Sequence, residues 1–388
     1  MRRRFIPAFL LTASLLLLLL PGRAAAAEYT FRAGNAGPQG ARVDGAGEIA
    51  EDWRVFLDAL PEEENLLRDT DLSDPAAAVD AVRSALAPEN LYEWLSEAVG
   101  RAAEAVIPAA SPLVALLLLC AAVRYAVPSG AMGEGMGRVM GLAASVTVFR
   151  LTADALELAN RAASAVCSMA ELLVPVAEGI CLFGGGLTEA RVTRVGLMLA
   201  ATAVEEAAGR VLIPASGVVL GLAAVSGGRG IAYQTAGALQ RLLLRIWQAL
   251  AVGMAFLLGA QTVLARAADT AGLRWSRFAL SSFVPVAGSA LSDAWSSIAA
   301  GLRTLRGAVG IGGILAMASA AAPAVGPLLL WQAVFALTRG AADALELKEL
   351  SSLLQQAGGI VSLLSAFCLY ALAMFIVELA LFAGIGAG

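Results

Sequence analysis

Long apolar segments separated by short polar ones fill the chain from Ala105 to the C-terminus. A membrane-spanning helix needs about 20 mostly apolar residues. Seven segments have this character, and they are Ile107–Val127, Val139–Leu158, Ala163–Gly186, Val195–Val225, Leu242–Ala265, Ile311–Leu337 and Ile360–Ile385. The pattern predicts an all-α polytopic membrane domain over residues 105–388, with about seven transmembrane helices.

Two segments leave this number open by one in either direction. Val139–Leu158 is the weakest span, because it carries Arg150, Asp154 and Glu157. Residues 279–300 are apolar enough to enter the bilayer, although Pro285 and several serines interrupt them.

The first 27 residues have the layout of a secretory signal peptide. Arg2, Arg3 and Arg4 precede the apolar stretch Phe5–Leu20, and alanines at 24–27 suit cleavage after Ala27. An uncleaved anchor helix is the alternative. Both interpretations export the residues that follow.

Residues 28–104 form an acidic segment, with 17 Asp and Glu against 6 Arg and a net charge of −11. Apolar residues recur there at helical spacing in three places, beginning near Trp53, Val79 and Leu91. We predict a small extracytoplasmic region of about three short helices. It is too small to hold much core by itself, so we expect it to pack on the membrane domain or on a partner. A solvated acidic linker is the alternative.

The exported N-terminal region makes the first span run from outside to inside. The loops that then fall in the cytoplasm hold modestly more arginine than the opposite loops. This excess is in the direction of the positive-inside rule, and it predicts a cytoplasmic C-terminus.

Composition agrees with a membrane protein and excludes much enzymology. Hydrophobic residues make up 59% of the chain and charged residues 15%, against about 45–50% and 25% in soluble domains. There is no histidine, and Lys348 is the only lysine, so histidine-based catalysis and a Walker A loop are absent. The four cysteines form no metal-binding spacing. We expect no catalytic residue, no metal and no cofactor.

Similar proline phrases interrupt several apolar segments. "VIPAASP" and "LIPASGV" contain Pro108 and Pro214, and "LVPVAEG" and "FVPVAGS" contain Pro175 and Pro285. Because proline removes a backbone donor and clashes with the preceding turn, we expect helix breaks at these prolines and at Gly288. The order of the phrases suggests an internal repeat of about 108 residues. Many transporters contain internal repeats. Chance similarity in a chain rich in alanine, valine and leucine is the alternative.

The phrase "GEGMGRVMG" places Gly133, Gly137 and Gly141 four residues apart. Small residues at this spacing let membrane helices approach closely, so they are candidate helix-packing positions. Ordinary loop glycines are the alternative.

Several ionisable or amide side chains lie within or beside the apolar segments. They are Glu171, Glu178, Glu205, Glu206, Arg210, Gln261, Asp269, Asp293 and Glu378. A charge at the centre of a membrane helix costs on the order of 2.5–3.5 kcal/mol and usually faces protein or water. We therefore take this set as candidates for a polar pathway or for subunit contacts.

Internal ion pairs are the alternative for these charges. The spacing of Glu206 and Arg210 suits such a pair, and we favour it there. Glu171 and Glu178 have no basic residue close by in the sequence, which favours a cavity or a partner contact.

The order of signal peptide, exported segment and polytopic domain resembles the stage III sporulation protein AE family of endospore-forming bacteria. The resemblance covers most of the chain after Ala105 and is sharpest over Phe256–Val325. Its features there are Gln261, Asp269, the phrase "FVPVAGSALSD" and the Gly-rich "LRGAVGIGGIL".

The resemblance implies a membrane subunit of the secretion-like complex that joins mother cell and forespore, acting as a channel or feeding tube. Its implied partners are the other stage III A-operon proteins, including a cytoplasmic ATPase, and stage II sporulation protein Q. We also expect membrane lipid and further copies of the chain as partners, and no nucleic acid. The alternative is a secondary transporter, with a midplane site where Pro-broken helices meet.

Overall fold

The computed structural model describes residues 41–59, 80, 83–126, 131–183, 187–226, 230–254, 256 and 288–383. Within these ranges the chain is helical and contains no strand. The helices are α2 (Ala41–Asp58), α4 (Pro88–Ala126), α5 (Ala131–Phe183), α6 (Leu187–Glu206), the π-helix η3 (Ala207–Leu212), α7 (Ile213–Ser226), a helix of residues 230–254, α9 (Gly288–Ala344) and α10 (Lys348–Phe382). The prediction of an all-α protein is confirmed.

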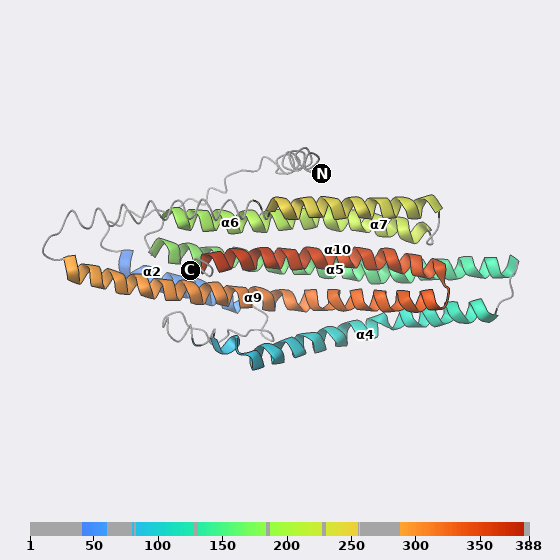
Figure 1. The fold of residues 1–388 in the computed structure, drawn as a ribbon, viewed down its shortest axis with the longest axis horizontal. Helices are drawn as coiled ribbons and strands as arrows, with labels where there is room; N and C mark the ends of the chain where they lie inside the picture. The colour runs from blue at the N-terminus through green and yellow to red at the C-terminus, as the bar shows by residue number, and fades with distance from the viewer. Residues whose placement is uncertain are drawn as a thin grey trace, which may run out of the picture.

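The long helices lie side by side along one axis, as Figure 1 shows. α9 and α10 form an antiparallel hairpin, and α5 packs against both of them. A short turn at Leu345–Leu347 joins α9 to α10, and Glu346 has a positive φ of 53° there. Large buried side chains in this part of the bundle include Leu173, Phe335 and Phe367.

Five helices are long and apolar enough to cross a membrane within the described part of the chain. They are Pro88–Ala126, Val139–Leu182, Ala190–Ser226, Thr304–Ala344 and Lys348–Ala380. This agrees with a polytopic helical membrane protein. Several helices are much longer than a bilayer requires: α9 has 57 residues, which at 1.5 Å per residue is about 85 Å.

The predicted spans Val139–Leu158 and Ala163–Gly186 are not separate helices. Residues 131–183 form the single helix α5 of 53 residues. The residues between the two predicted spans include no glycine or proline. Arg161 also bonds Glu157 at 3.0 Å with i,i+4 spacing, which supports a continuous helix.

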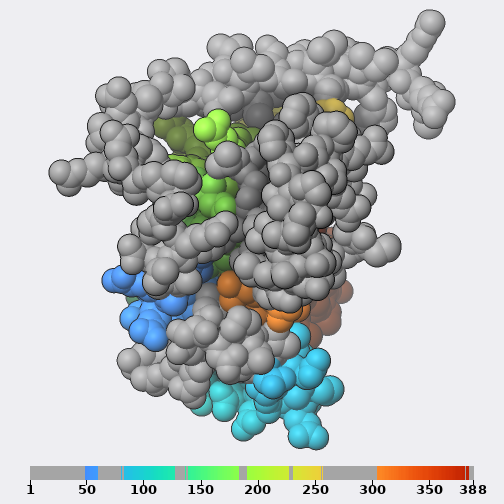
Figure 2. Space-filling view, turned by 90° about the vertical axis from the view of Figure 1, so that its left-hand side faces the viewer, coloured from blue at the N-terminus to red at the C-terminus, as the bar shows by residue number. Residues whose placement is uncertain are grey.

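α2 corresponds to the first of the three helices predicted in the acidic segment. Trp53 and Phe56 are buried, and α2 packs against α5. Figure 2, which looks at one end of the bundle, shows α2 in blue, α4 in cyan and α9 in orange close together. The acidic segment was expected to pack on the membrane domain or on a partner, and α2 packs on α5.

The predicted boundary between residues 104 and 105 falls inside a helix. α4 begins at Pro88 and continues to Ala126. Its early part packs on α9, where a Cβ on Gly326 would lie 3.3 Å from the Cβ of Ala102. The third helix expected in the exported segment is therefore the first part of a spanning helix.

Most prolines expected to break helices do not do so. Pro108 lies inside α4 and Pro175 inside α5. Pro214 is the second residue of α7 and follows the π-helix η3 without interruption of the helical path. Neighbouring helices and local π-type adjustments make proline tolerable in membrane helices. Gly288 begins α9, and Pro285 lies outside the described residues.

The three glycines of the "GEGMGRVMG" phrase lie in the first turns of α5. Gly141 faces α10, because a Cβ on it would lie 3.4 Å from a carboxylate oxygen of Glu349. Gly141 therefore lies at a helix contact, whereas packing at Gly133 and Gly137 stays a prediction.

Candidate functional site

The α5–α6 hairpin brings Glu178 next to a basic side chain. Arg194 Nη1 on α6 donates to both carboxylate oxygens of Glu178, at 3.1 and 3.4 Å. Glu178 therefore has an internal ion pair, which was the alternative to the cavity or partner contact that the sequence favoured. The two residues lie eight positions on either side of Gly186, on successive helices.

Glu171 and Glu205 both lie near the Cys167 thiol on the same hairpin. Cys167 on α5 donates through its thiol to the carbonyl oxygen of Ala201 on α6 at 3.5 Å. Glu171 and Glu205 are both close enough to this thiol to interact with it electrostatically. Both carboxylate side chains are exposed. The structure thus gathers two of the predicted site residues from different helices.

Glu206 and Arg210 form the predicted ion pair, with Nε to carboxylate oxygen at 2.5 Å. The pair spans the start of η3, the only π-helix among the described elements. π-Helical turns are rare and are frequent at functional sites. Here the widened turn carries Arg210 on its exposed side.

Glu378 lies apart from this hairpin, on α10. Its Oε1 atom is buried and has no hydrogen-bond partner in the described part of the chain. Nearby, Arg306 of α9 lies over the ring of Phe382, 5.2 Å from its centroid, and donates to the sulfur of Cys181 at 3.2 Å. Arg306 thus lies where α5, α9 and α10 meet.

Three further candidates cannot be placed at a site. Gln261 and Asp269 lie outside the described residues. Asp293 lies on α9, but only its backbone is described.

The cysteines and carboxylates form no metal centre within the described ranges, because no group of three potential ligands gathers there. All four cysteines are buried and free of disulfides.

The transporter alternative needed half-helix ends at Pro175 and Pro285, and Pro175 lies inside continuous α5.

The comparison with known families agrees with the apolar helices and the arrangement of the bundle. The model of the stage III sporulation protein AE family matches residues 83–386. The chain belongs to the stage III sporulation protein AE family. The match begins just before α4 and includes all five helices that could cross a membrane. No curated protein and no solved structure matches the chain.

Membership of the stage III sporulation protein AE family gives this protein a role associated with sporulation. The family is one of sporulation membrane proteins and is not a known enzyme family.

Proposed function

We propose that this protein is a membrane subunit of the channel-like complex that connects the mother cell and the forespore, and that forespore development requires it. The observation that carries the proposal is the family match over residues 83–386. That match includes every described helix able to cross a membrane.

The proposed location is the mother-cell membrane at the sporulation septum, with several spans. The residues after the signal peptide lie outside the cytoplasm, so the acidic segment faces the space between the two septal membranes. The partners are the other stage III A-operon proteins with their cytoplasmic ATPase, stage II sporulation protein Q, and further copies of this chain. The protein contributes a wall or a scaffold, and no catalytic step.

Deletion of the gene in its endospore-forming host tests the role in development. We expect engulfed forespores that fail to express a late forespore reporter, and a loss of heat-resistant spores by several orders of magnitude. A plasmid copy of the full chain restores both readouts. Normal numbers of heat-resistant spores in the deletion strain would contradict the proposal.

Affinity purification from sporulating cells tests membership of the complex. We expect the other A-operon proteins to copurify with the tagged full-length chain. The matched control is an equally abundant tagged membrane protein from the same cells. Equal recovery with both baits would argue against membership. Solute uptake by vesicles that contain only this protein would support the transporter alternative instead.

A further inference from the structure

A polar stripe runs along one outward face of α5, inside a segment apolar enough to span a membrane. It starts at Arg150, proceeds in alternating steps of four and three residues, and ends at Glu178. Six of its positions are charged, and they are Arg150, Asp154, Glu157, Arg161, Glu171 and Glu178. Alternating steps of four and three keep side chains on one face of a helix. The stripe is therefore one continuous line of about 42 Å, at 1.5 Å per residue.

The remaining stripe positions are Ser164, Ser168 and Pro175. Every stripe residue is exposed except Glu178, which is half-buried against α6. The residues between them, such as Ala159, Val166 and Leu173, are buried in the bundle. α5 therefore has an apolar face that packs on its neighbours and a polar face that does not.

Two other helices expose apolar side chains near the level of the stripe's middle. The Cys368 thiol lies 3.7 Å from the carbonyl oxygen of Ala159, and the Tyr370 hydroxyl lies 2.5 Å from that of Ala251. Leu369 follows Cys368 on α10, and Val252 follows Ala251 on the helix of residues 230–254. Ala159 is five residues from Ser164 on α5, about 7.5 Å at 1.5 Å per residue.

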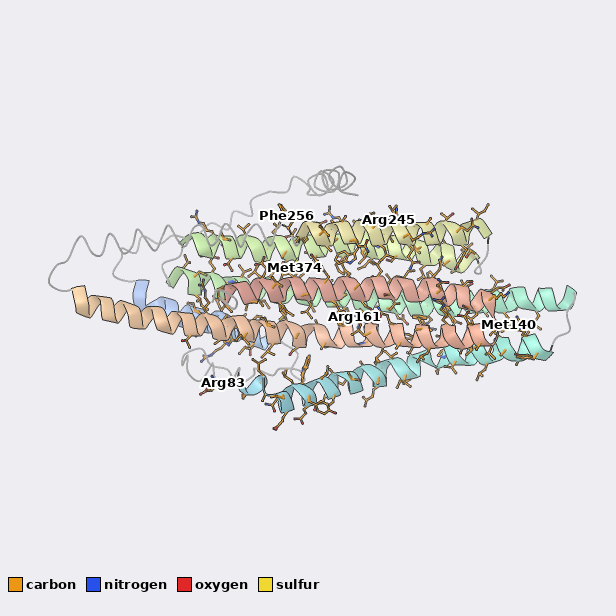
Figure 3. All side chains as sticks on the ribbon, in the orientation of Figure 1. Arg83, Met140, Arg161, Arg245, Phe256 and Met374 are labelled. Atoms are coloured by element: carbon orange, nitrogen blue, oxygen red, sulfur yellow. The ribbon has the colours of Figure 1, made fainter. Side chains whose placement is uncertain are left out.

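Leu369 is 42% exposed and Val252 is 63% exposed. Figure 3 labels Arg161 part-way along the bundle at this level, far from both ends of α5. In this part of the bundle, the molecule thus exposes apolar side chains on α10 and on the helix of residues 230–254, and charged side chains on α5.

Contact between the stripe and lipid chains is energetically unfavourable. Each charge at the centre of a membrane helix costs on the order of 2.5–3.5 kcal/mol. Among the stripe carboxylates, only Glu157 and Glu178 have an ion-pair partner in the described part of the chain. Glu157 pairs with Arg161, and Glu178 pairs with Arg194.

The backbone adds to this cost at Pro175. Proline lacks an N–H, so the carbonyl of Glu171, four residues earlier, loses its usual helical donor. Such a group needs protein or water at membrane depth. Both the side chains and the backbone of the stripe therefore require a polar surrounding.

We propose that the α5 stripe lines a water-filled passage through the membrane domain. Beside it, α6 exposes Thr202 and Glu205 together with the apolar Val195 and Met198. The exposed apolar residues Leu369 and Val252 face lipid. This inference rests on the proposed role as a membrane subunit and gives that subunit the face that conducts.

Thiol accessibility in the full-length protein tests the passage. The four native cysteines are first replaced by alanine or serine, and Ser164→Cys and Ser168→Cys are then introduced singly. Two controls, Leu369→Cys and Val252→Cys, measure the reaction at exposed apolar positions of other helices. Ser145→Cys is a matched serine control on the same helix, because Ser145 is buried at 4% exposure.

Each variant is treated in membrane vesicles with a membrane-impermeant, cationic methanethiosulfonate reagent. Unreacted thiols are then counted with a fluorescent maleimide after denaturation, which also shows that every thiol is present. Because the thiolate is the reacting form and requires water, we expect Ser164→Cys and Ser168→Cys to react at least about tenfold faster than the three controls.

Two results would overturn the inference. Equal, fast reaction at the two serine positions and at Leu369 and Val252 would mean that this part of the bundle lies outside the membrane. The stripe would then be ordinary solvent-exposed surface. Equal, slow reaction at all positions would mean that the stripe is covered by lipid or protein. The result is separable from the proposed function, since normal sporulation of a deletion strain would remove the biological role and leave a water-accessible stripe intact.

Discussion

A close approach of α9 to the end of α10 depends on the missing side chain at Gly310. A Cβ there would lie 2.5 Å from the Cβ of Ala383 and 3.1 Å from the backbone oxygen of Leu379. Small residues allow this proximity where lipid offers no hydrophobic driving force between helices. The contact joins the middle of α9 to the end of α10.

Gly310→Ala should therefore destabilise the bundle. We expect a loss of about 1–3 kcal/mol, typical of overpacking, because the backbone of Leu379 cannot move aside as a flexible side chain can. Gly307→Ala is the matched control on the same helix, since nothing lies within 4 Å of its added Cβ. The control should be neutral or gain up to about 1 kcal/mol from helix propensity. Thermal unfolding in detergent measures both, and equal stability would contradict the close packing.

The ion pair between Glu178 and Arg194 can be tested by a double-mutant cycle. The side chains are 26% and 45% exposed, so we expect a coupling of no more than about 1 kcal/mol. Glu178→Gln and Arg194→Gln should each lower stability, and the double variant should lose less than their sum. Strict additivity, measured by the same unfolding assay, would mean that the two side chains do not interact in the membrane.

At the scale of single helices, hydropathy located the apolar segments but not the helix ends. All five candidate spans overlap apolar segments predicted from the sequence. The predicted segments were cut to bilayer length, whereas a helix ends where its backbone bonding ends. α5 and α4 therefore continue through charged residues at which hydropathy predicted a loop or a domain boundary.

Pro175→Ala tests whether α5 is continuous through its proline. Alanine restores the hydrogen bond from residue 175 to the carbonyl of Glu171, so we expect a gain in stability of up to about 3 kcal/mol. Pro88→Ala is the control: Pro88 is the first residue of α4, where a helix makes no use of the missing N–H. A loss of stability in Pro175→Ala, with Pro88→Ala unchanged, would favour a break that the fold needs.

At the scale of the whole molecule, the acidic segment that the sequence predicts to be exported shares packing with the membrane domain. Ala102 belongs to the predicted exported region and Gly326 to the predicted span Ile311–Leu337, yet they touch. The first part of α4 is held against α9 over this contact. The two regions should therefore unfold together.

A disulfide tests this contact. Disulfides need Cβ atoms about 3.5–4.5 Å apart, close to the 3.3 Å between Ala102 and a Cβ at Gly326. In the chain without native cysteines, Ala102→Cys with Gly326→Cys should cross-link under mild oxidation. After cleavage at a protease site engineered into residues 127–130, the two fragments should stay joined until reduced.

Gly100→Cys with Gly326→Cys is the control pair, because a Cβ on Gly100 meets nothing within 4 Å. It should give separate fragments. Cross-linking of both pairs at the same rate, or of neither, would argue that α4 is not held against α9.

The sequence by itself determined the class of the molecule: an all-α membrane protein of the stage III sporulation protein AE family. These properties are local, because apolar length and motif order can be read along the chain. Tertiary structure decided which residues meet. It paired Glu178 with Arg194 and brought both Glu171 and Glu205 near the Cys167 thiol. Such outcomes depend on where each helix turns back and which neighbour it meets, and residue spacing within one helix does not contain that information.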